Sequence, residues 1–403
     1  MSAFGSALRD ARVSRGLSLR AMSALVNWDF GYLGQIERGA RQASANLAAA
    51  CDRALDAGGI LVAAFERESG EADMRRRSVL RALGAMALST GPAAVTLEAL
   101  RHGLSAAVRN HVDEWEQIVT DYGYAFYTTA ADELMEQVTA DLAVLQTVLA
   151  ADTTARRPAL LRVAGQLSVI VALGLVSSGQ PYLARRWWAT ADRLADESGD
   201  PDARVLTWAW NVVNGCYDGR PLDQAIAVSD QALPLANDRP TAATCGLLAG
   251  RAQALARAGR HTEATATVER LADVTEGLPA AVVGEVESLW GWPEHRLRHT
   301  ESYVHTHTGA LAKAEAAQDR VLELYPASQV RLRTQVQLHR ATCLIKGGCV
   351  SDGLRYAADV IDGLPSEQHN QVVYAVARQV AAVVPAPERR QPVFGELTAR
   401  FDG

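Results

Sequence analysis

The stretch from Ser18 to Gly39 (SLRAMSALVNWDFGYLGQIERG) constrains the fold more than any other part of the chain. It predicts two short helices joined by a tight turn. Ser18 and Asp29 are suitable N-caps because their side-chain oxygens can accept hydrogen bonds from the free amides of a first helical turn. Asn27 and Trp28 form the predicted turn, and Gly39 ends the second helix where a left-handed residue is needed.

Apolar spacing assigns a buried side to each of these helices. In the first helix the residues expected to be buried are Leu19, Met22, Ala24 and Leu25. In the second helix Leu33 and Ile36 share the inner face, since they are three residues apart. The residues of that helix expected to face outward are Phe30, Gly31, Gly34 and Gln35. A preceding helix over residues 3–14 is predicted with Phe4, Leu8 and Val13 inward and with Arg9, Arg12 and Arg15 outward.

This part of the chain resembles the lambda-repressor-like, XRE-type helix-turn-helix family. The residues that carry the resemblance are Leu8-Arg9-x-x-Arg12-x-x-x-Gly16-Leu17-Ser18 and Tyr32-Leu33-x-x-Ile36-Glu37-Arg38-Gly39. The likeness continues into two more helices expected at 44–57 and 60–68. It implies a five-helix DNA-binding domain over residues 1–70. A generic helical bundle with solvated polar faces is the alternative, but it does not explain the Ile36-Glu37-Arg38-Gly39 ending.

The resemblance also implies which side chains contact a double-stranded DNA operator. Those placed to read bases or to lie closest to the DNA backbone are Phe30, Gly31, Tyr32, Gly34 and Gln35. Gln35 is the main candidate for base recognition, because an amide can form two hydrogen bonds with adenine. The residues placed to hold phosphates are Arg20, Arg38 and Arg41, and such contacts fix the register of a protein on DNA without reading its sequence.

The charge distribution agrees with one DNA-binding end. Residues 1–82 contain 12 arginines against 9 Asp and Glu, a balance of +3, and the remainder has 28 Lys and Arg against 37 acidic residues, a balance of −9. A basic N-terminal region followed by an acidic remainder suits a protein that binds DNA through one end. Residues 71–92, which include Arg75-Arg76-Arg77, are predicted to form an Arg-rich linker helix.

Residues 93–403 are predicted to form a solenoid of helix pairs. Glycines recur at Gly179, Gly219, Gly259, Gly309 and Gly348, with separations of 40, 40, 50 and 39 residues. Each is expected to end one helix, with a small residue such as Ala184 or Ala264 inside the next, where two helices cross closely. Such pairs must stack on their neighbours to bury their apolar faces. The unit resembles the tetratricopeptide repeat, most clearly at 299–326, and 385–401 is expected to close the array.

In such an array the first helix of each pair lines the concave wall, which identifies candidate ligand-binding residues. Aligned on the glycines, these are Gln166, Trp210, Asn211, Asn214, Tyr217, Gln253, Arg296, His299, Tyr303 and Gln337. Amides suit a peptide ligand because each can bond to a backbone N–H and C=O together. Core tryptophans and solvated asparagines are an equally open alternative for Trp208, Trp210, Asn211 and Asn214.

Catalytic, metal and cofactor sites are not expected. The sequence has no Walker loop, no G-x-S-x-G and no Rossmann glycine set. His295 and His299 lie four residues apart, but no H-E-x-x-H surrounds them, so hydrogen bonds between helices are favoured over metal binding for these residues and for His305 and His307. A histidine pH sensor stays open. Five scattered cysteines without C-x-x-C indicate reduced thiols in a cytoplasmic protein.

The sequence therefore predicts an all-α, cytoplasmic transcription regulator that is not an enzyme. No apolar run reaches the ~18–20 residues that span a bilayer, so no membrane contact is expected. The combination resembles the peptide-sensing regulators of Gram-positive bacteria and many actinobacterial regulators. That resemblance implies a homodimer whose solenoid binds a small signal, a peptide or a small molecule, as in quorum sensing. The alternative is a DNA-tethered scaffold whose solenoid binds a protein partner and no small ligand.

Overall fold

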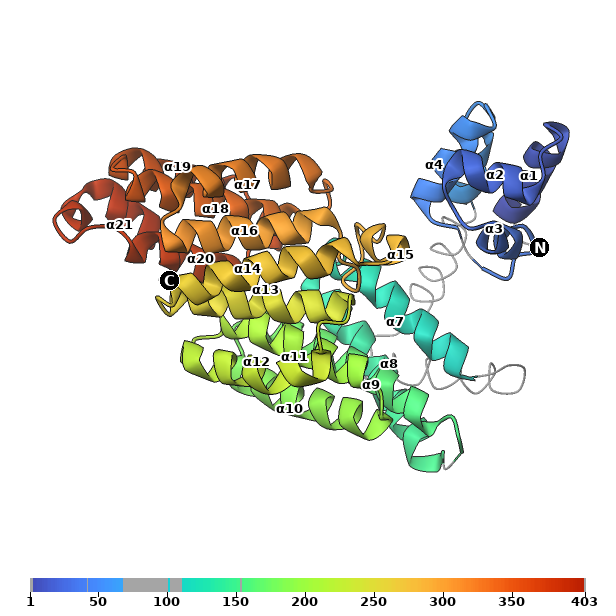
Figure 1. The fold of residues 1–403 in the computed structure, drawn as a ribbon, viewed down its shortest axis with the longest axis horizontal. Helices are drawn as coiled ribbons and strands as arrows, with labels where there is room; N and C mark the ends of the chain where they lie inside the picture. The colour runs from blue at the N-terminus through green and yellow to red at the C-terminus, as the bar shows by residue number, and fades with distance from the viewer. Residues whose placement is uncertain (1–2, 42, 68–100, 102–110, 153, 402–403) are drawn as a thin grey trace, which may run out of the picture. The chain divides into compact units, whose positions relative to one another are not determined.

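The computed structural model describes residues 3–41, 43–67, 101, 111–152 and 154–401, and all regular elements within these residues are helices (Figure 1). This confirms the predicted all-α class. The chain divides into two compact units, Met1–Ser89 and Thr90–Gly403. The predicted linker helix at 71–92 lies outside the described residues. The domain boundaries predicted at residues 70 and 92 also fall there and stay predictions.

The described part of the first unit forms five helices around one core. Their bounds are α1 Ala3–Ser14, α2 Leu19–Val26, α3 Phe30–Glu37, α4 Ala45–Ala54 and a helix over 60–67. The largest core side chains are Phe4, Leu8, Met22, Leu33, Ile36, Leu47 and Leu61. The helix α4 ends three residues earlier than predicted. Its Asp52 carboxylate then accepts hydrogen bonds from the Gly59 amide (2.8 Å) and the Leu61 amide (2.9 Å) at the start of the last helix.

Four of the orientations predicted for α1 and α2 are wrong. Leu25 is 56% exposed and Ala24 is exposed, because the buried face of α2 carries Met22 and Val26, which are four residues apart. Val13 is 58% exposed at the end of α1. Arg12 points inward instead of outward, for a reason given with the site below.

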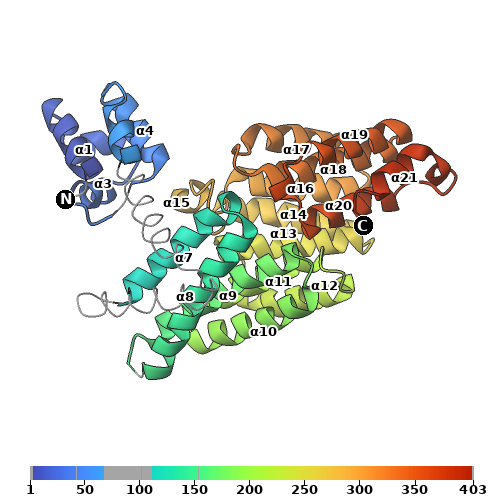
Figure 2. The same cartoon turned by 180° about the vertical axis from the view of Figure 1, so that it is seen from behind.

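The second unit is built mainly from antiparallel helix pairs (Figures 1 and 2). It begins with α7 His111–Thr128 and α8 Ala131–Ala151. The pairs that follow are α9 Arg157–Ser177 with α10 Pro181–Ser198, α11 Pro201–Gly215 with α12 Leu222–Ala236, α13 Ala242–Arg257 with α14 His261–Glu276, α16 Glu294–Thr308 with α17 Leu311–Leu324, α18 Val330–Lys346 with α19 Val350–Asp362, and α20 Gln371–Ala382 with α21 Pro392–Thr398. Short elements lie between them at α15 Ala280–Val283, Ser366–Gln368 and Glu388–Arg390.

The repeating glycines are where the sequence places them. Gly179, Gly219, Gly259, Gly309 and Gly348 each follow the first helix of a pair, with φ between +75° and +93°. This left-handed conformation is strained for residues with a Cβ. The small residues predicted inside the next helices, Ala184, Ala225, Ala264 and Ala314, have no exposed surface. The close helix crossings expected from the small residues are therefore present.

The first helices of the pairs close on themselves. Each of α9, α11, α13, α16 and α18 contacts the first helix of the next pair, and α20 returns to contact α9. At that junction the Gln371 side chain packs against Gly179, where a Cβ would lie 2.9 Å from the Gln371 Cγ. The inner wall of this unit is therefore joined from its first pair to its last, and the first helices surround a common space.

The long spacing between Gly259 and Gly309 has a structural reason. The extra residues form α15 and a following segment, 284–293, that crosses to α7. There the Leu289 amide donates a hydrogen bond to the Gly123 carbonyl (2.8 Å), and the Trp290 indole N–H donates to the Val119 carbonyl (2.8 Å). This crossing segment adds a further wall to the space inside the ring.

The helix α9 is long and apolar enough to cross a membrane by length and composition, which corrects the expectation that no such segment exists. Within the most apolar window of α9, 78% of the residues are buried inside the protein. Burial on nearly all sides explains the composition, because α9 contacts α7, α8, α10, α11 and α20.

Candidate DNA-binding face and ligand cavity

The caps predicted for the helix-turn-helix are formed. Ser18 Oγ accepts a hydrogen bond from the Ala21 amide (3.1 Å), and Asp29 Oδ1 accepts one from the Tyr32 amide (2.9 Å). Between the helices Asn27 adopts a left-handed conformation (φ 58°) and ends α2. Because these caps satisfy amides that a helix leaves free, they fix where α3 begins and how it leaves the turn.

A nearly buried ion pair fixes α3 against α1. Arg12 Nε and Nη2 donate to the two oxygens of the Glu37 carboxylate at 2.6 and 2.7 Å, and Arg12 Nη1 donates to the Leu17 carbonyl (2.6 Å). The side chains are only 12% and 6% exposed. This explains why Arg12 points inward: the carboxylate at the end of α3 needs a partner away from water. The hydrogen bond to Glu37 raises the pKa of Arg12, so the guanidinium stays charged.

The exposed side of α3 presents aromatic, amide and cationic groups. Gln35 is exposed, and the Phe30 side chain is 45% exposed. The Arg20 guanidinium lies 5.3 Å from the centre of the Phe30 ring, and that of Arg41 lies 5.2 Å from the centre of the Tyr32 ring. Stacking on the rings holds both cations close to α3. Arg38, also exposed, follows directly as the C-cap.

The two glycines of α3 are placed differently from the prediction. Gly34 is buried, not outward, because it faces α2. A Cβ there would lie 3.3 Å from Leu19 Cδ1 and 3.3 Å from Arg38 Nη1. Gly31 is half-buried, and a Cβ there would lie 2.9 Å from the capping oxygen of Asp29. The absence of a side chain at these positions serves helix packing and capping within the protein.

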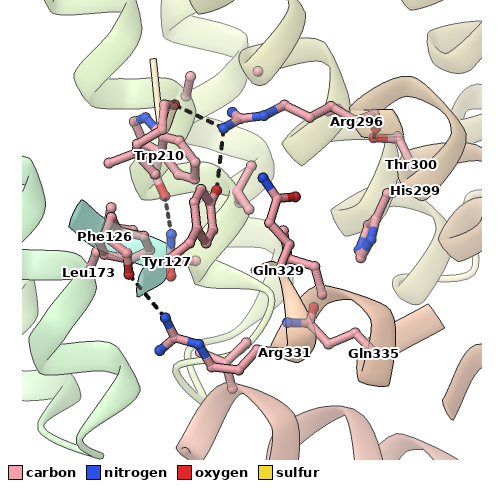
Figure 3. Close-up of a pocket in the computed structure, with 18 of the residues that line it drawn as sticks. Phe126, Tyr127, Leu173, Trp210, Arg296, His299, Thr300, Gln329, Arg331 and Gln335 are labelled. Atoms are coloured by element: carbon pink, nitrogen blue, oxygen red, sulfur yellow. Dashed lines mark hydrogen bonds between the residues drawn. The ribbon is translucent and has the colours of Figure 1, made fainter. Parts of the chain in front are cut away.

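The second unit contains a cavity of about 170 Å³ inside its ring of first helices (Figure 3). Six of the ten predicted ligand-binding residues line this cavity: Trp210, Asn214, Tyr217, Gln253, Arg296 and His299. Further lining residues include Phe126, Tyr127, Trp290, Trp292, Tyr325, Gln329, Arg331 and Gln335. The walls are thus mainly aromatic and aliphatic, with a few polar groups among them, as is usual for small-molecule sites.

The other four predicted residues do not line the cavity. Gln166 is half-buried elsewhere on α9, and Gln337 is replaced by Gln335, two residues earlier on α18. Asn211 Oδ1 accepts a hydrogen bond from Arg220 (2.7 Å). Tyr303 is fully buried and packs edge-on against Tyr217, with ring centres 6.3 Å apart. A helix turns by about 100° per residue, so small errors of alignment move a side chain off the wall.

The polar groups around the cavity are held by hydrogen bonds within the protein. The Asn214 amide donates to the Trp210 carbonyl (2.9 Å), and the Tyr217 hydroxyl donates to Gln253 Oε1 (3.3 Å). His299 Nδ1 lies 2.6 Å from the Tyr325 hydroxyl. Burial lowers the pKa of His299 to about 4, so this histidine is neutral near pH 7.

Two arginines reach the cavity next to consecutive aromatic residues of α7 (Figure 3). Arg296 Nη2 donates to the Ser288 and Leu289 carbonyls (both 3.0 Å) and lies 3.3 Å from the Tyr127 hydroxyl. Arg331 Nη2 donates to the Phe126 carbonyl (3.1 Å). The Arg296 guanidinium also lies 5.5 Å from the centre of the Trp210 ring. These contacts join α16 and α18 to α7 across the cavity.

Sequence reasoning missed the residues that α7 and the crossing segment bring to the cavity. Phe126 and Tyr127 belong to a helix before the regular pairs, and Trp290 and Trp292 lie outside any first helix. The 50-residue spacing between Gly259 and Gly309, with Leu-Trp-Gly-Trp at 289–292, is the signal that could have found the tryptophans.

His299 and His307 form hydrogen bonds between helices, as favoured from the sequence, whereas His295 Nε2 has no hydrogen-bond partner among the described residues. Besides His299, Ser302 Oγ lies 2.9 Å from His339 Nδ1, and His307 Nε2 lies 3.2 Å from Gln379 Oε1. Burial lowers the pKa of His295 and of His307 to about 3. Among the described residues, no three His, Cys, Asp or Glu side chains are grouped so that they could hold a metal ion.

Comparison with known proteins supports the first unit. A family model described as a helix-turn-helix domain matches residues 3–65. No curated protein matches the chain in sequence. The match, together with the capped pair α2 and α3, supports an XRE-like helix-turn-helix and a DNA-binding regulator.

Proposed function

We propose that the chain is a cytoplasmic, sequence-specific transcription regulator whose operator binding is controlled by a small molecule. This molecule would be held in the cavity of the second unit, which is called the repeat unit from here on. The observation that carries the proposal is this cavity, which combines aromatic walls with Trp210, Arg296 and His299 in a chain that also has a helix-turn-helix. No catalytic role is assigned to any of its residues.

In the DNA-binding unit, α3 is the proposed recognition helix. Its exposed Gln35 would read a base edge in the major groove, and Phe30 and Tyr32 flank it. Arg20, Arg38 and Arg41 would hold phosphates, since all three are exposed around α3. Gly34 is not included, because it is buried against Leu19.

The cavity favours a small-molecule sensor over a protein-binding scaffold. A scaffold would be supported by an acidic concave face without a pocket, whereas none of the residues lining this cavity is Asp or Glu. An apolar protein cavity of ~150 Å³ can hold one benzene molecule, so about 170 Å³ suits a compact ligand better than an extended peptide.

In this proposal the ligand controls operator binding through a homodimer of the chain. Two recognition helices must enter half-sites about one helical turn apart, ~34 Å, for both to bind. A ligand that binds one arrangement of the repeat units more tightly shifts the population toward it, and thereby raises or lowers operator affinity.

A thermal-shift measurement tests the proposal. The purified chain is mixed with the fraction below ~2 kDa from an extract of its own host cells. If that fraction contains a ligand at 100 times its Kd, binding stabilises the folded state by ~2.7 kcal/mol. Ser177 lines the cavity, whereas the adjacent Ser178 is exposed outside it. We expect the fraction to stabilise the wild type and Ser178→Phe but not Ser177→Phe, in which the ring fills the cavity. Equal stabilisation of both variants, or none of the wild type, would reject the sensor.

A further inference from the structure

The charges of the cavity are unbalanced. Two arginines, Arg296 and Arg331, line it, and no Asp or Glu does. Neither arginine forms an ion pair with any described residue. Elsewhere in this unit the buried Arg220 is paired with Asp218, and their side chains are 6% and 0% exposed. Because removing a charge from water is costly unless it is paired, two half-buried cations without carboxylate partners need an explanation.

Hydrogen bonds within the protein use only part of each guanidinium. Arg296 and Arg331 donate through Nη2 alone, and their Nε and Nη1 groups have no acceptor among the described residues. A guanidinium offers five N–H donors in a planar fork that fits a carboxylate. Burial lowers the pKa of Arg331, which agrees with the lack of a neighbouring anion.

One further polar atom of the wall lacks a partner. Gln329 is 1% exposed, its Nε2 donates to the Val286 carbonyl (3.0 Å), and its Oε1 has no partner among the described residues. The bond to Val286 fixes which amide atom is the oxygen, so an acceptor without a partner belongs to a residue that lines the same cavity as the two arginines. The remaining walls are apolar, with the rings of Phe126, Trp210 and Trp292 among them.

We propose that the ligand is an organic acid: a compact, ring-bearing apolar body with one carboxylate, which binds at Arg331 and Arg296. The inference rests on the proposed function, since it names the ligand class of the same cavity. The carboxylate would supply the missing negative charge, the rings of the wall would stack on the ligand body, and a hydroxyl or N–H on the ligand would satisfy Gln329.

The test compares acids with their neutral amides of the same shape. Calorimetric titration of the full chain uses benzoate against benzamide and 2-naphthoate against 2-naphthamide. We expect at least one acid to bind roughly 10- to 100-fold more tightly than its amide, the gain typical of a hydrogen bond to a charged group. Arg331→Gln should remove this preference, because it should weaken binding of the acid much more than binding of its amide, and residual binding of the amide shows that the cavity is intact. Arg331 is chosen because it makes one hydrogen bond within the protein, whereas Arg296 makes three.

Two further variants complete the design. Arg331→Lys keeps the charge and should keep part of the preference for the acid. Arg355→Gln changes an arginine that is 66% exposed on α19 and should leave both affinities unchanged. If each acid and its amide bind equally, or if Arg331→Gln weakens both alike, the inference is overturned. If none of the four compounds binds, it is overturned as well. In all these cases the extract experiment with Ser177→Phe still decides the proposed function independently.

Discussion

In the helix-turn-helix unit the side chains proposed to touch DNA lie on the outside of α3, whereas in the repeat unit those proposed to touch the ligand line a cavity inside the ring of first helices. The first site depends on local features, two caps and one ion pair between α1 and α3. The second depends on contacts between segments far apart in the chain, such as Trp290 with Val119. An exposed site can therefore be lost by changing one helix, while the cavity depends on the closure of the whole ring.

The largest expected effect separates the stability of the two units. In Glu37→Ala the buried Arg12 loses its carboxylate partner, which should destabilise the helix-turn-helix unit by about 3–5 kcal/mol. Hydrogen exchange followed by mass spectrometry should show lost protection in α1–α4 and unchanged protection in α16–α18. Arg15→Ala is the control, because the Arg15–Asp56 pair is exposed and should contribute less than ~1 kcal/mol. Equal loss of protection in both units would contradict their separate stability.

The next effect is a dependence on pH that only the repeat unit should show. All nine histidines lie between residues 102 and 369, and none lies in residues 1–89. Burial lowers the pKa of His299 to about 4 from its ordinary value of 6.5, so the unfolded chain binds more protons between these values. Stability is therefore fully present above pH 6.5 and is lost as the pH falls toward 4, by up to ~1.4 kcal/mol per pH unit for one histidine.

Urea denaturation at pH 7, 6 and 5 measures this dependence. His295 and His307, whose pKa values are lowered to about 3, should add to the slope. The variant His299→Gln should flatten it, whereas His261→Gln, at an exposed histidine, should not. A repeat unit equally stable at pH 7 and pH 5 would mean that these histidines are not held neutral.

Variants on α3 should separate base recognition from phosphate contact. Gln35→Ala should cost about 1–3 kcal/mol on the preferred operator and little on unrelated DNA. Arg38→Ala should weaken binding to all sequences and reduce the salt slope by ~1. Fluorescence anisotropy on operator and scrambled duplexes at several salt concentrations distinguishes the two effects. If both variants bind as the wild type does, α3 is not the helix in the groove.

The smallest expected effect concerns the cap of α3. Asp29→Ala removes the acceptor for the Tyr32 amide and should destabilise the helix-turn-helix unit by ~1 kcal/mol. Ser14→Ala, which removes an exposed hydroxyl at the end of α1, should change stability by less than ~0.5 kcal/mol. Thermal unfolding of both variants beside the wild type provides the comparison, and equal stability of the two would argue against the cap.

Much of the fold could be predicted because its signals are local. Ser18 and Asp29 cap helices through amides only three residues away, and the left-handed glycines end helices within one turn. Gly34 was misassigned because its neighbour Leu19 belongs to another helix, which periodicity within α3 cannot reveal. Arg12 was misassigned because its partner lies 25 residues away at Glu37.

Part of the cavity could be predicted because the helical periodicity of its wall is also a local signal. Periodicity identified the wall on α11 and α16, where Trp210, Asn214 and His299 lie. It could not identify Tyr127 or Arg331, whose places depend on hydrogen bonds between residues 169 and 205 positions apart. The contact of α20 with α9 is also between segments far apart in the chain, so the ring of helices around the cavity followed only from the structure.

Operator affinity measured with the cavity occupied and empty tests the central claim most directly. An operator is first selected from genomic fragments with the full chain. Its Kd is then measured with and without the stabilising small-molecule fraction, for the wild type, Ser177→Phe and Ser178→Phe. We expect the fraction to change the Kd by at least ~5-fold, the lower range of allosteric coupling, in the wild type and Ser178→Phe only. An unchanged Kd in the wild type, or the same change in Ser177→Phe, would contradict control of the DNA-binding unit by the cavity.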